Sequence, residues 1–394
     1  MRPFDPFHTP DAAREEKPWP AGGFGAGHFL PEPAGQVREW RLEPFAPHED
    51  ADVPADRFHL WVRVGGQEPV CGTLGPPGGP RCWQSLPGLR ARNRALFPCV
   101  WSDVAAEPPL PVALQRTAFS PIIPGRDRES SLPLHVVLWR IRNAADEPVE
   151  AGFMLTWACA WPALVPGAQF DLQHDNLCIT GALGRPDSLN RIGISVPDLH
   201  SNGIWQQGME PWDAAGDGHE VWEDFAEDGE LESVLARGES LAAAAWVKFR
   251  LEPGEAREVP FVVVWHFPFY AAGPLAGEPR SYTRYLTKAR PDNAIIWLAE
   301  EALEHFGAEI PNWQHWLRQI ADWHAATPDA ERLNALGALL DLETQWSADG
   351  RFRAEVPVDS AAQWVRARLS AAPPLETLWP SIASGPLPDR PERA

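Results

Sequence analysis

The sequence LHVVLWRIRN (residues 134–143) is followed by the turn AADEP (144–148) and then by EAGFMLTW (150–157). Branched and aromatic residues dominate the first and last of these segments, which favours β-strands. The Asp and Pro of the middle segment are turn formers. This order of strand, turn and strand is typical of antiparallel sandwiches, and it predicts two strands with a short connection between them.

Alternation of apolar and polar residues appears earlier in the chain. Apolar residues occupy every second position in 37–42 and 57–64, and Gly65-Gly66 then signals a hairpin turn. Further strands are predicted at 114–119, 177–180, 191–196, 242–251 and 257–265, and a loop at 72–81. Short strands separated by Gly and Pro turns predict a mainly β fold, a large antiparallel β-sandwich over residues 21–290.

Helical spacing of apolar residues replaces the strand pattern after Arg290-Pro291. It predicts three helices, 292–306, 311–325 and 328–342, with Asp292 as the N-cap of the first. Residues 291–345 therefore form a short α-helical C-terminal segment. Residues 1–20 are predicted to be disordered, and 346–394 are predicted to form a hairpin and a Pro-rich tail.

Composition argues against several classes of function. The chain has 34 Lys and Arg against 54 Asp and Glu, and its net charge of −20 disfavours nucleic acid as a partner. No stretch has the length and apolar character of a transmembrane segment or a signal peptide, and the five Cys include no CxxC pair. We therefore expect a cytoplasmic protein. We expect no metal, because His305, His315 and His324 lack the spacing of a zinc motif.

Two features allow both a structural and a functional interpretation. The 20 Trp mostly fill a core, although some indole faces could serve as platforms for sugar rings. The acidic run EVWEDFAEDGELE (220–232) contains enough carboxylates for Ca²⁺, but it lacks the order of a calcium loop. We interpret this run as a solvated loop that turns Trp222 and Phe225 inward.

Several phrases in a fixed order resemble the N-terminal domain of one family, the non-lysosomal glucosylceramidase and bile-acid β-glucosidase family (glycosyl-hydrolase family 116). The phrases are GGFGAG (22–27), REWRL (38–42), FSPIIP (119–124), SSLP (130–133), WRIRN (139–143), VWEDF (221–225), DGEL (228–231), VVVW (262–265) and YTRY (282–285). Each phrase alone is common in turns or strands. Their joint order over residues 21–345 is far more specific.

The resemblance implies a retaining β-glucosidase in which a β-sandwich packs on an (α/α)-toroid. Such enzymes use a nucleophile and an acid ~5–5.5 Å apart, with both carboxylates on the toroid, and they need no cofactor. The helices predicted here would be the opening of an incomplete toroid, so we assign no catalytic residue. Glu355 is the one relic candidate, by its offset from LWP (378–380), but its flanks do not match. An exposed Glu in a hairpin is the preferred interpretation.

Three hypotheses for function remain open. The first is the N-terminal sandwich of a β-glucosidase, non-catalytic alone or one half of a split glycosidase. The second is a carbohydrate-binding or scaffold protein, and the third is a complete β-glucosidase that uses carboxylates of the sandwich. The corresponding partners are a separate helical catalytic chain and a glucoside or glycolipid ligand.

An interface or ligand-binding surface is predicted around the glycine-rich loop. Glycine permits close backbone approach, and Arg and Trp often anchor interfaces. The candidate residues are Gly22, Gly23, Gly25, Gly27, Arg38, Trp40 and Arg41.

Overall fold

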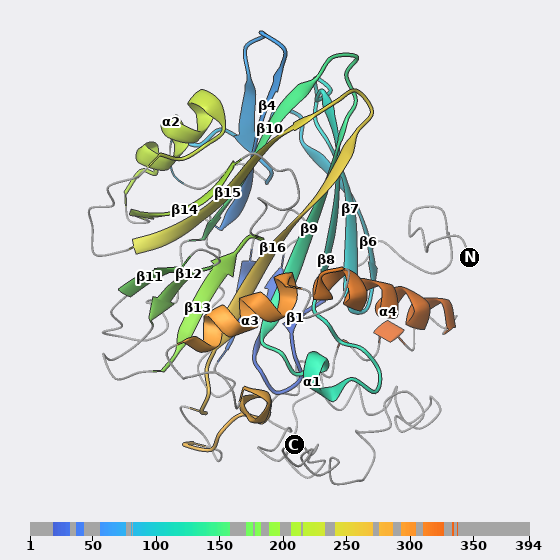
Figure 1. The fold of residues 1–394 in the computed structure, drawn as a ribbon, viewed down its shortest axis with the longest axis vertical. Helices are drawn as coiled ribbons and strands as arrows, with labels where there is room; N and C mark the ends of the chain where they lie inside the picture. Colours follow the sequence, from blue (N-terminus) through green and yellow to red (C-terminus); the bar gives the residue numbers. More distant parts are fainter. Residues whose placement is uncertain are drawn as a thin grey trace.

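The computed structural model shows two large antiparallel sheets and a small number of helices (Figure 1). It describes residues 19–31, 37–42, 56–75, 80, 82–157, 171–175, 178–182, 189–197, 206–213, 216–232, 241–270, 276–286, 293–304, 310–326, 333, 334 and 337. The predicted mainly β fold and antiparallel sandwich are confirmed.

The smaller of the two large sheets has five strands, each antiparallel to its neighbours. Their order is β14 (Gln206–Asp213), β15 (Leu241–Leu251), β10 (Val149–Trp157), β4 (Arg57–Val64) and β5 (Val70–Thr73). The β4–β5 hairpin turns at Gly65, whose φ of 50° is in the left-handed region that glycine tolerates. The hairpin predicted from Gly65-Gly66 is thus confirmed.

The larger sheet has eight strands and forms the other half of the sandwich. Their order is β11 (Asp171–Asp175), β12 (Cys178–Ala182), β13 (Arg191–Ser195), β16 (Ala256–His266), β9 (Leu134–Asn143), β8 (Val112–Phe119), β7 (Cys99–Ala105) and β6 (Arg90–Leu96). A third, small sheet joins β1 (Ala21–Gly22), β2 (His28–Pro31) and β3 (Val37–Arg41).

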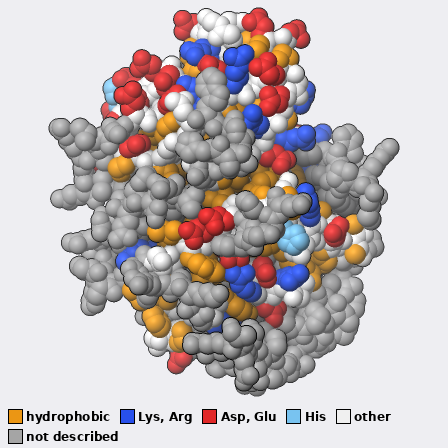
Figure 2. All heavy atoms as spheres, viewed as in Figure 1, with side chains coloured by type: hydrophobic (Ala, Val, Ile, Leu, Met, Phe, Trp, Pro, Cys, Tyr) orange, Lys and Arg blue, Asp and Glu red, His pale blue; other side chains and the backbone are white. Residues whose placement is uncertain are grey.

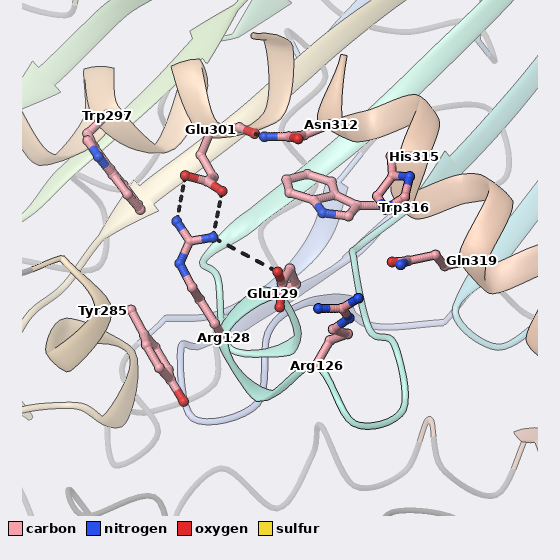
Figure 3. A pocket seen from close by; sticks show the side chains of 10 residues that line it. All are labelled: Arg126, Arg128, Glu129, Tyr285, Trp297, Glu301, Asn312, His315, Trp316 and Gln319. Atoms are coloured by element: carbon pink, nitrogen blue, oxygen red, sulfur yellow. Dashed lines mark hydrogen bonds and ion pairs between the residues drawn. The ribbon is translucent and has the colours of Figure 1, made fainter. Parts of the chain in front are cut away.

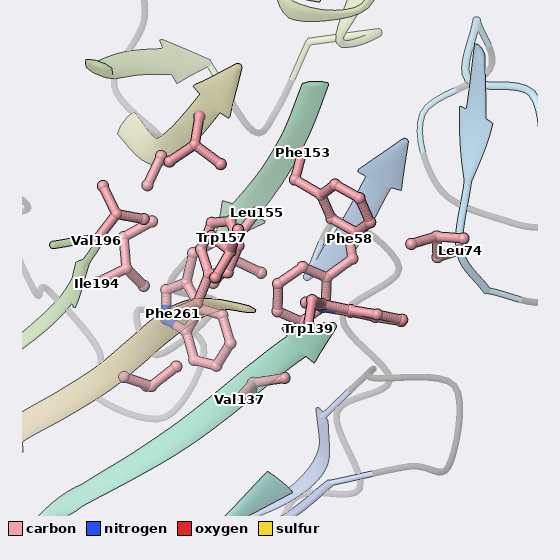
Figure 4. Close-up of a cluster of buried hydrophobic side chains, with 14 of the residues drawn as sticks. Phe58, Leu74, Val137, Trp139, Phe153, Leu155, Trp157, Ile194, Val196 and Phe261 are labelled. Carbon is pink, nitrogen blue, oxygen red and sulfur yellow. The ribbon is translucent and has the colours of Figure 1, made fainter. Parts of the chain in front are cut away.

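The main core fills the space between the two large sheets (Figure 4). Along β16, Phe261 and Val263 belong to this core, whereas Val262 and Val264 belong to a second cluster with the helices on the opposite face. Side chains alternate across a strand, so a strand covered on both faces becomes an unbroken apolar run. This explains why apolar and polar residues do not alternate in the sequence at 261–265.

Helices cover the outer face of each sheet (Figure 1). The helices are α1 (Asp127–Ser130), α2 (His219–Asp228), the 3-10 helix η4 (Ser281–Tyr285), α3 (Ala294–Leu303) and α4 (Asn312–Ala326). Trp222 and Phe225 of α2 pack on Trp61 and Trp246 of the five-stranded sheet. The α3 and α4 helices share a cluster with the outward side chains of the eight-stranded sheet.

The segments on either side of AADEP lie in different sheets, so this turn is a crossing between sheets. Asn143, fully buried, holds it in place. Its Nδ2 donates to the carbonyl oxygens of Glu147 at 2.8 Å and Leu251 at 3.1 Å, and its Oδ1 accepts from the backbone N–H of Ala145 at 2.8 Å. Leu251 is the last residue of β15, and the chain crosses to the other sheet after it, just as it does after β9. The side chain of Asn143 therefore contacts both connections between the sheets, β9–β10 and β15–β16.

Some predictions differ from the structure. The run 220–232, predicted as a loop, is mostly the helix α2, although Trp222 and Phe225 are buried as expected. The loop predicted at 72–81 overlaps the end of β5, and β6, β7 and β14 were not predicted. Residues 1–18, 346–394 and most of the predicted helix 328–342 lie outside the described residues. In the part of the chain that is described, no helix has the length and hydropathy needed to span a membrane.

Candidate functional site

A cavity of about 550 Å³ lies where the α1 turn, η4, α3 and α4 meet (Figure 3). Aromatic, charged and amide side chains line it together. The described residues that line it are Arg126, Arg128, Glu129, Tyr285, Trp297, Glu301, Asn312, His315, Trp316 and Gln319. The space is therefore bounded by the loop before β9 on one side and by the helical layer on the other.

An ion pair between Arg128 and Glu301 crosses the cavity (Figure 3). Nη1 and Nη2 of Arg128 donate to Oε1 and Oε2 of Glu301 at 2.7 and 2.6 Å, a bidentate arrangement. Burial acts to lower the pKa of Arg128, but the hydrogen bonds and charge of Glu301 outweigh burial and raise that pKa above its usual value. The side-chain amide of Asn312 also donates to the carbonyl oxygen of Glu301 at 2.7 Å. The pair thus joins the α1 turn to α3, and Asn312 joins α3 to α4.

Two aromatic rings stand beside cations at one side of the cavity. The guanidinium carbon of Arg128 lies 5.4 Å from the ring centre of Trp297. Arg284 lies 4.6 Å from the ring centre of Tyr285 and donates to its hydroxyl at 2.8 Å. Burial raises the pKa of Tyr285 although Arg284 opposes the shift, so the phenol keeps its proton near neutral pH.

The carboxylates of the cavity are poorly suited to hydrolysis of a glycosidic bond. Both oxygens of Glu301 accept hydrogen bonds from Arg128, and Glu129 lies 4.0 Å from the same guanidinium. A retaining hydrolase needs one carboxylate free to attack and a second that delivers a proton. Two carboxylates that share one arginine serve an ion-pair network, and their arrangement fixes the cavity wall.

The predicted glycine-rich loop, 22–27, is buried and contacts the end of the α1 turn. The backbone N–H of Phe24 donates to the carbonyl oxygen of Ser130 at 2.8 Å. A Cβ added at Gly23 would lie 2.5 Å from the carbonyl carbon of Ser131, closer than real contacts allow. Gly25 and Gly27 have φ values of 71° and 81°, where side chains are strained. The loop therefore supports the α1 turn from inside.

Of the remaining predicted site residues, those whose side chains the structure describes do not line the cavity. Gly22 is buried and its N–H donates to Ser120 Oγ at 2.9 Å, while Arg41 is half-buried at the end of β3. Arg38 and Trp40 belong to the backbone of β3, but their side chains lie outside the described part. Glu355 also falls outside it. Whether these residues bind a partner stays a prediction.

Histidine and acidic side chains form no group of three suited to a metal in the described residues. His315 is exposed at the cavity, whereas His324 is buried and its Nε2 bonds to the carbonyl oxygen of Phe97 at 2.9 Å. Burial lowers the pKa of His324 to about 4, so it is neutral at physiological pH. His305 lies outside the described residues.

The cavity itself was not predicted from the sequence, although a signal was present. Helical spacing identified the apolar stripe of residues 292–306 but left Trp297 and Glu301 unassigned. These two residues are four positions apart and so share the other face of the helix. His315 and Gln319 repeat this spacing on α4, whereas Trp316 belongs to the apolar stripe of that helix. A second, aromatic and polar face on each helix was the available clue.

Comparison with known proteins identifies a family and several solved structures of low similarity. Residues 19–308 match the family model described as beta-glucosidase 2, glycosyl-hydrolase family 116 N-term. A structure described as a kojibiose phosphorylase from human microbiome aligns with 84% of this chain and 35% of its own, at 5% identity and a TM-score of 0.37. The heparan sulfate lyase HepC from Pedobacter heparinus aligns with 45% of this chain and 22% of its own, at 10% identity and a TM-score of 0.23.

This chain thus spans about a third of the length of the first of those structures, at 35%. The family match is the stronger finding, because the matched residues, 19–308, are more than half of the 394 residues. It covers the sandwich, the α1 turn and α3. The chain therefore belongs to the glycosyl-hydrolase family 116 N-terminal domain family, and is a glycosidase-related protein.

Proposed function

We propose that this chain provides the non-catalytic sandwich of a β-glucosidase-type hydrolase. A helical unit, within the same protein or on a separate chain, would supply the nucleophile and the acid. The observation that carries the proposal is that Glu129 and Glu301 both face the guanidinium of Arg128. Family membership over residues 19–308 supports the hydrolase lineage.

The helical layer is the proposed docking region for the catalytic unit. The α3 and α4 helices bury one face against the eight-stranded sheet, and Ile296, Trp297 and Leu317 remain only partly buried beside that cluster. Partly covered aromatic and aliphatic side chains on a helical surface suit contact with further helices. A cytoplasmic location belongs to the same proposal, and the unpaired Cys71, Cys82 and Cys99 support it.

An assay of the purified chain with an aryl β-glucoside tests the proposal. We expect the same rate from the wild-type chain, from Glu301→Gln and from a buffer blank. A rate above the blank that falls in Glu301→Gln would show that the sandwich carboxylates catalyse hydrolysis, and the proposal would be wrong. The chain is then assayed with cell extract that is itself inactive. Hydrolysis only in the mixture supports a separate catalytic chain.

A further inference from the structure

We propose that the cavity between the α1 turn, η4, α3 and α4 is a binding site for a neutral saccharide. The inference goes beyond the function proposed above. Its volume, about 550 Å³, is within the usual range for small-ligand sites. Three kinds of observation support the choice of ligand: the aromatic walls, the unused polar groups and the balance of charge.

The aromatic walls suit the apolar C–H faces of a pyranose ring. Figure 3 shows Trp297 and Tyr285 on one side of the Arg128–Glu301 pair, and these two rings form the wall, whereas Trp316 on the other side is only 3% exposed. Arg128 is fixed by two short hydrogen bonds and stacks near Trp297, so this platform is held before a ligand arrives. A rigid aromatic surface loses little conformational entropy on binding.

The polar groups that a sugar needs are present and unused. Among the described residues, the side chains of Arg126, His315 and Gln319 line the cavity without a hydrogen bond or an ion pair to the protein. Guanidinium, imidazole and amide groups are planar and carry several donors or acceptors. Such groups around an aromatic platform match the ring of hydroxyls on a saccharide.

The charges of the cavity favour a neutral ligand. Arg126 and Arg128 are matched by Glu129 and Glu301, so the lining carries no net charge. The whole chain carries −20, which repels anionic sugars at long range. A cation would compete with Arg128 for carboxylates that are already paired. A neutral saccharide is neither repelled by the negative net charge nor in competition with Arg128 for the carboxylates.

Calorimetric titration of the whole chain with cellobiose tests the site. The pocket variant is Arg126→Ala with Gln319→Ala, two side chains that can be removed without breaking a hydrogen bond or an ion pair among the described residues. The matched control is Arg318→Ala, an exposed residue of the same helix that does not line the cavity. We expect wild type and control to bind alike, and the pocket variant to bind at least about fivefold more weakly, as for the loss of one hydrogen bond.

Three results would overturn the inference: no binding of cellobiose, equal binding by the pocket variant, or tighter binding of glucuronate than of cellobiose. Chromatography of the titrated sugar separates this test from that of the proposed function. Bound and intact cellobiose supports both. Cleaved cellobiose contradicts the non-catalytic assignment alone, and absent binding contradicts the saccharide site alone.

Discussion

Gly23 lies where the glycine-rich loop meets the turn that carries the arginines of the cavity. A Cβ at this position would lie 2.5 Å from Ser131 carbon and 2.6 Å from Leu132 oxygen, both of them backbone atoms that cannot rotate away. The sequence predicted close approach at the loop but assigned it to an external partner. The close approach at Gly23 is to Ser131 and Leu132 of the same chain. These residues are distant from the loop in sequence, so their position could not be predicted from the loop alone.

We expect Gly23→Ala to destabilise the protein by about 1–3 kcal/mol, the usual cost of forcing an extra methyl group into a packed site. The free energy of unfolding in urea measures the effect. Gly66→Ala is the matched control, because nothing lies within 4 Å of its added Cβ. Its stability should stay within ~0.5 kcal/mol of wild type. Equal stability of the two variants would show that the loop does not press on the turn.

At the scale of elements, the bidentate pair of Arg128 and Glu301 links the α1 turn to α3. The side chain of Glu301 is 7% exposed and that of Arg128 is 37% exposed, so solvent screens the pair only in part. Removing one partner leaves a largely buried charge behind when the remaining residue is Glu301.

A double-mutant cycle with Arg128→Leu and Glu301→Leu should give a coupling energy of about 1–2 kcal/mol, reduced from that of a fully buried pair by the exposure of Arg128. Urea unfolding of the four proteins measures it. The pair Arg92–Asp103, with side chains 53% and 35% exposed, serves as the control and should couple by less than ~0.5 kcal/mol. If both cycles give the same energy, burial does not strengthen the Arg128 pair.

Strands with one buried face and helices with a continuous apolar stripe could be predicted from the sequence. The helix α2 shows why other elements could not. Its sequence HEVWEDFAED (219–228) places Val221, Trp222 and Phe225 on one side, but its N-cap is Gly218 without a side-chain cap. Acidic side chains cover its outer surface, as seen at the upper left of Figure 2. The acidic residues suggested a solvated loop, whereas burial of three apolar residues in a tertiary contact outweighed that local preference.

The strand β6 was not predicted, for a related reason. Its first residues, Arg90, Ala91 and Arg92, are exposed, and only Ala95 and Leu96 are buried. An edge strand with so little buried surface has almost no alternation of apolar residues. Its pairing with β7 comes from the sheet, which no local pattern reveals.

Across the whole molecule, a buried neutral histidine occurs in several of its packed regions. Burial lowers the pKa of His59 and His135 to about 3, and that of His266 and His324 to about 4. His59 lies under α2 beside Trp83, whereas His324 lies between α4 and the large sheet. Loss of stability by protonation should therefore affect the whole sandwich together.

The sign of the pH dependence follows from proton binding. In the unfolded chain these histidines take up protons near pH 6.5, the ordinary pKa of the side chain, whereas in the folded protein they stay neutral down to about pH 4 or 3. Between those limits the unfolded chain binds more protons, so acid favours unfolding. The contribution of each neutral histidine to the free energy of unfolding is fully present above pH 6.5. It falls by about 1.4 kcal/mol for each pH unit between pH 6.5 and the pKa of that histidine in the folded protein.

We expect His324→Gln, which keeps an N–H donor for the Phe97 carbonyl oxygen, to flatten the fall in unfolding free energy between about pH 6 and 4.5 by roughly 1.4 kcal/mol per pH unit. Urea titrations at a series of pH values measure the slope. The control is His315→Gln, an exposed histidine nine residues earlier on the same helix, whose slope should match wild type. A slope for His324→Gln that equals that of the control would mean that His324 is already protonated in the folded protein. Burial between α4 and the sheet would then not determine its charge.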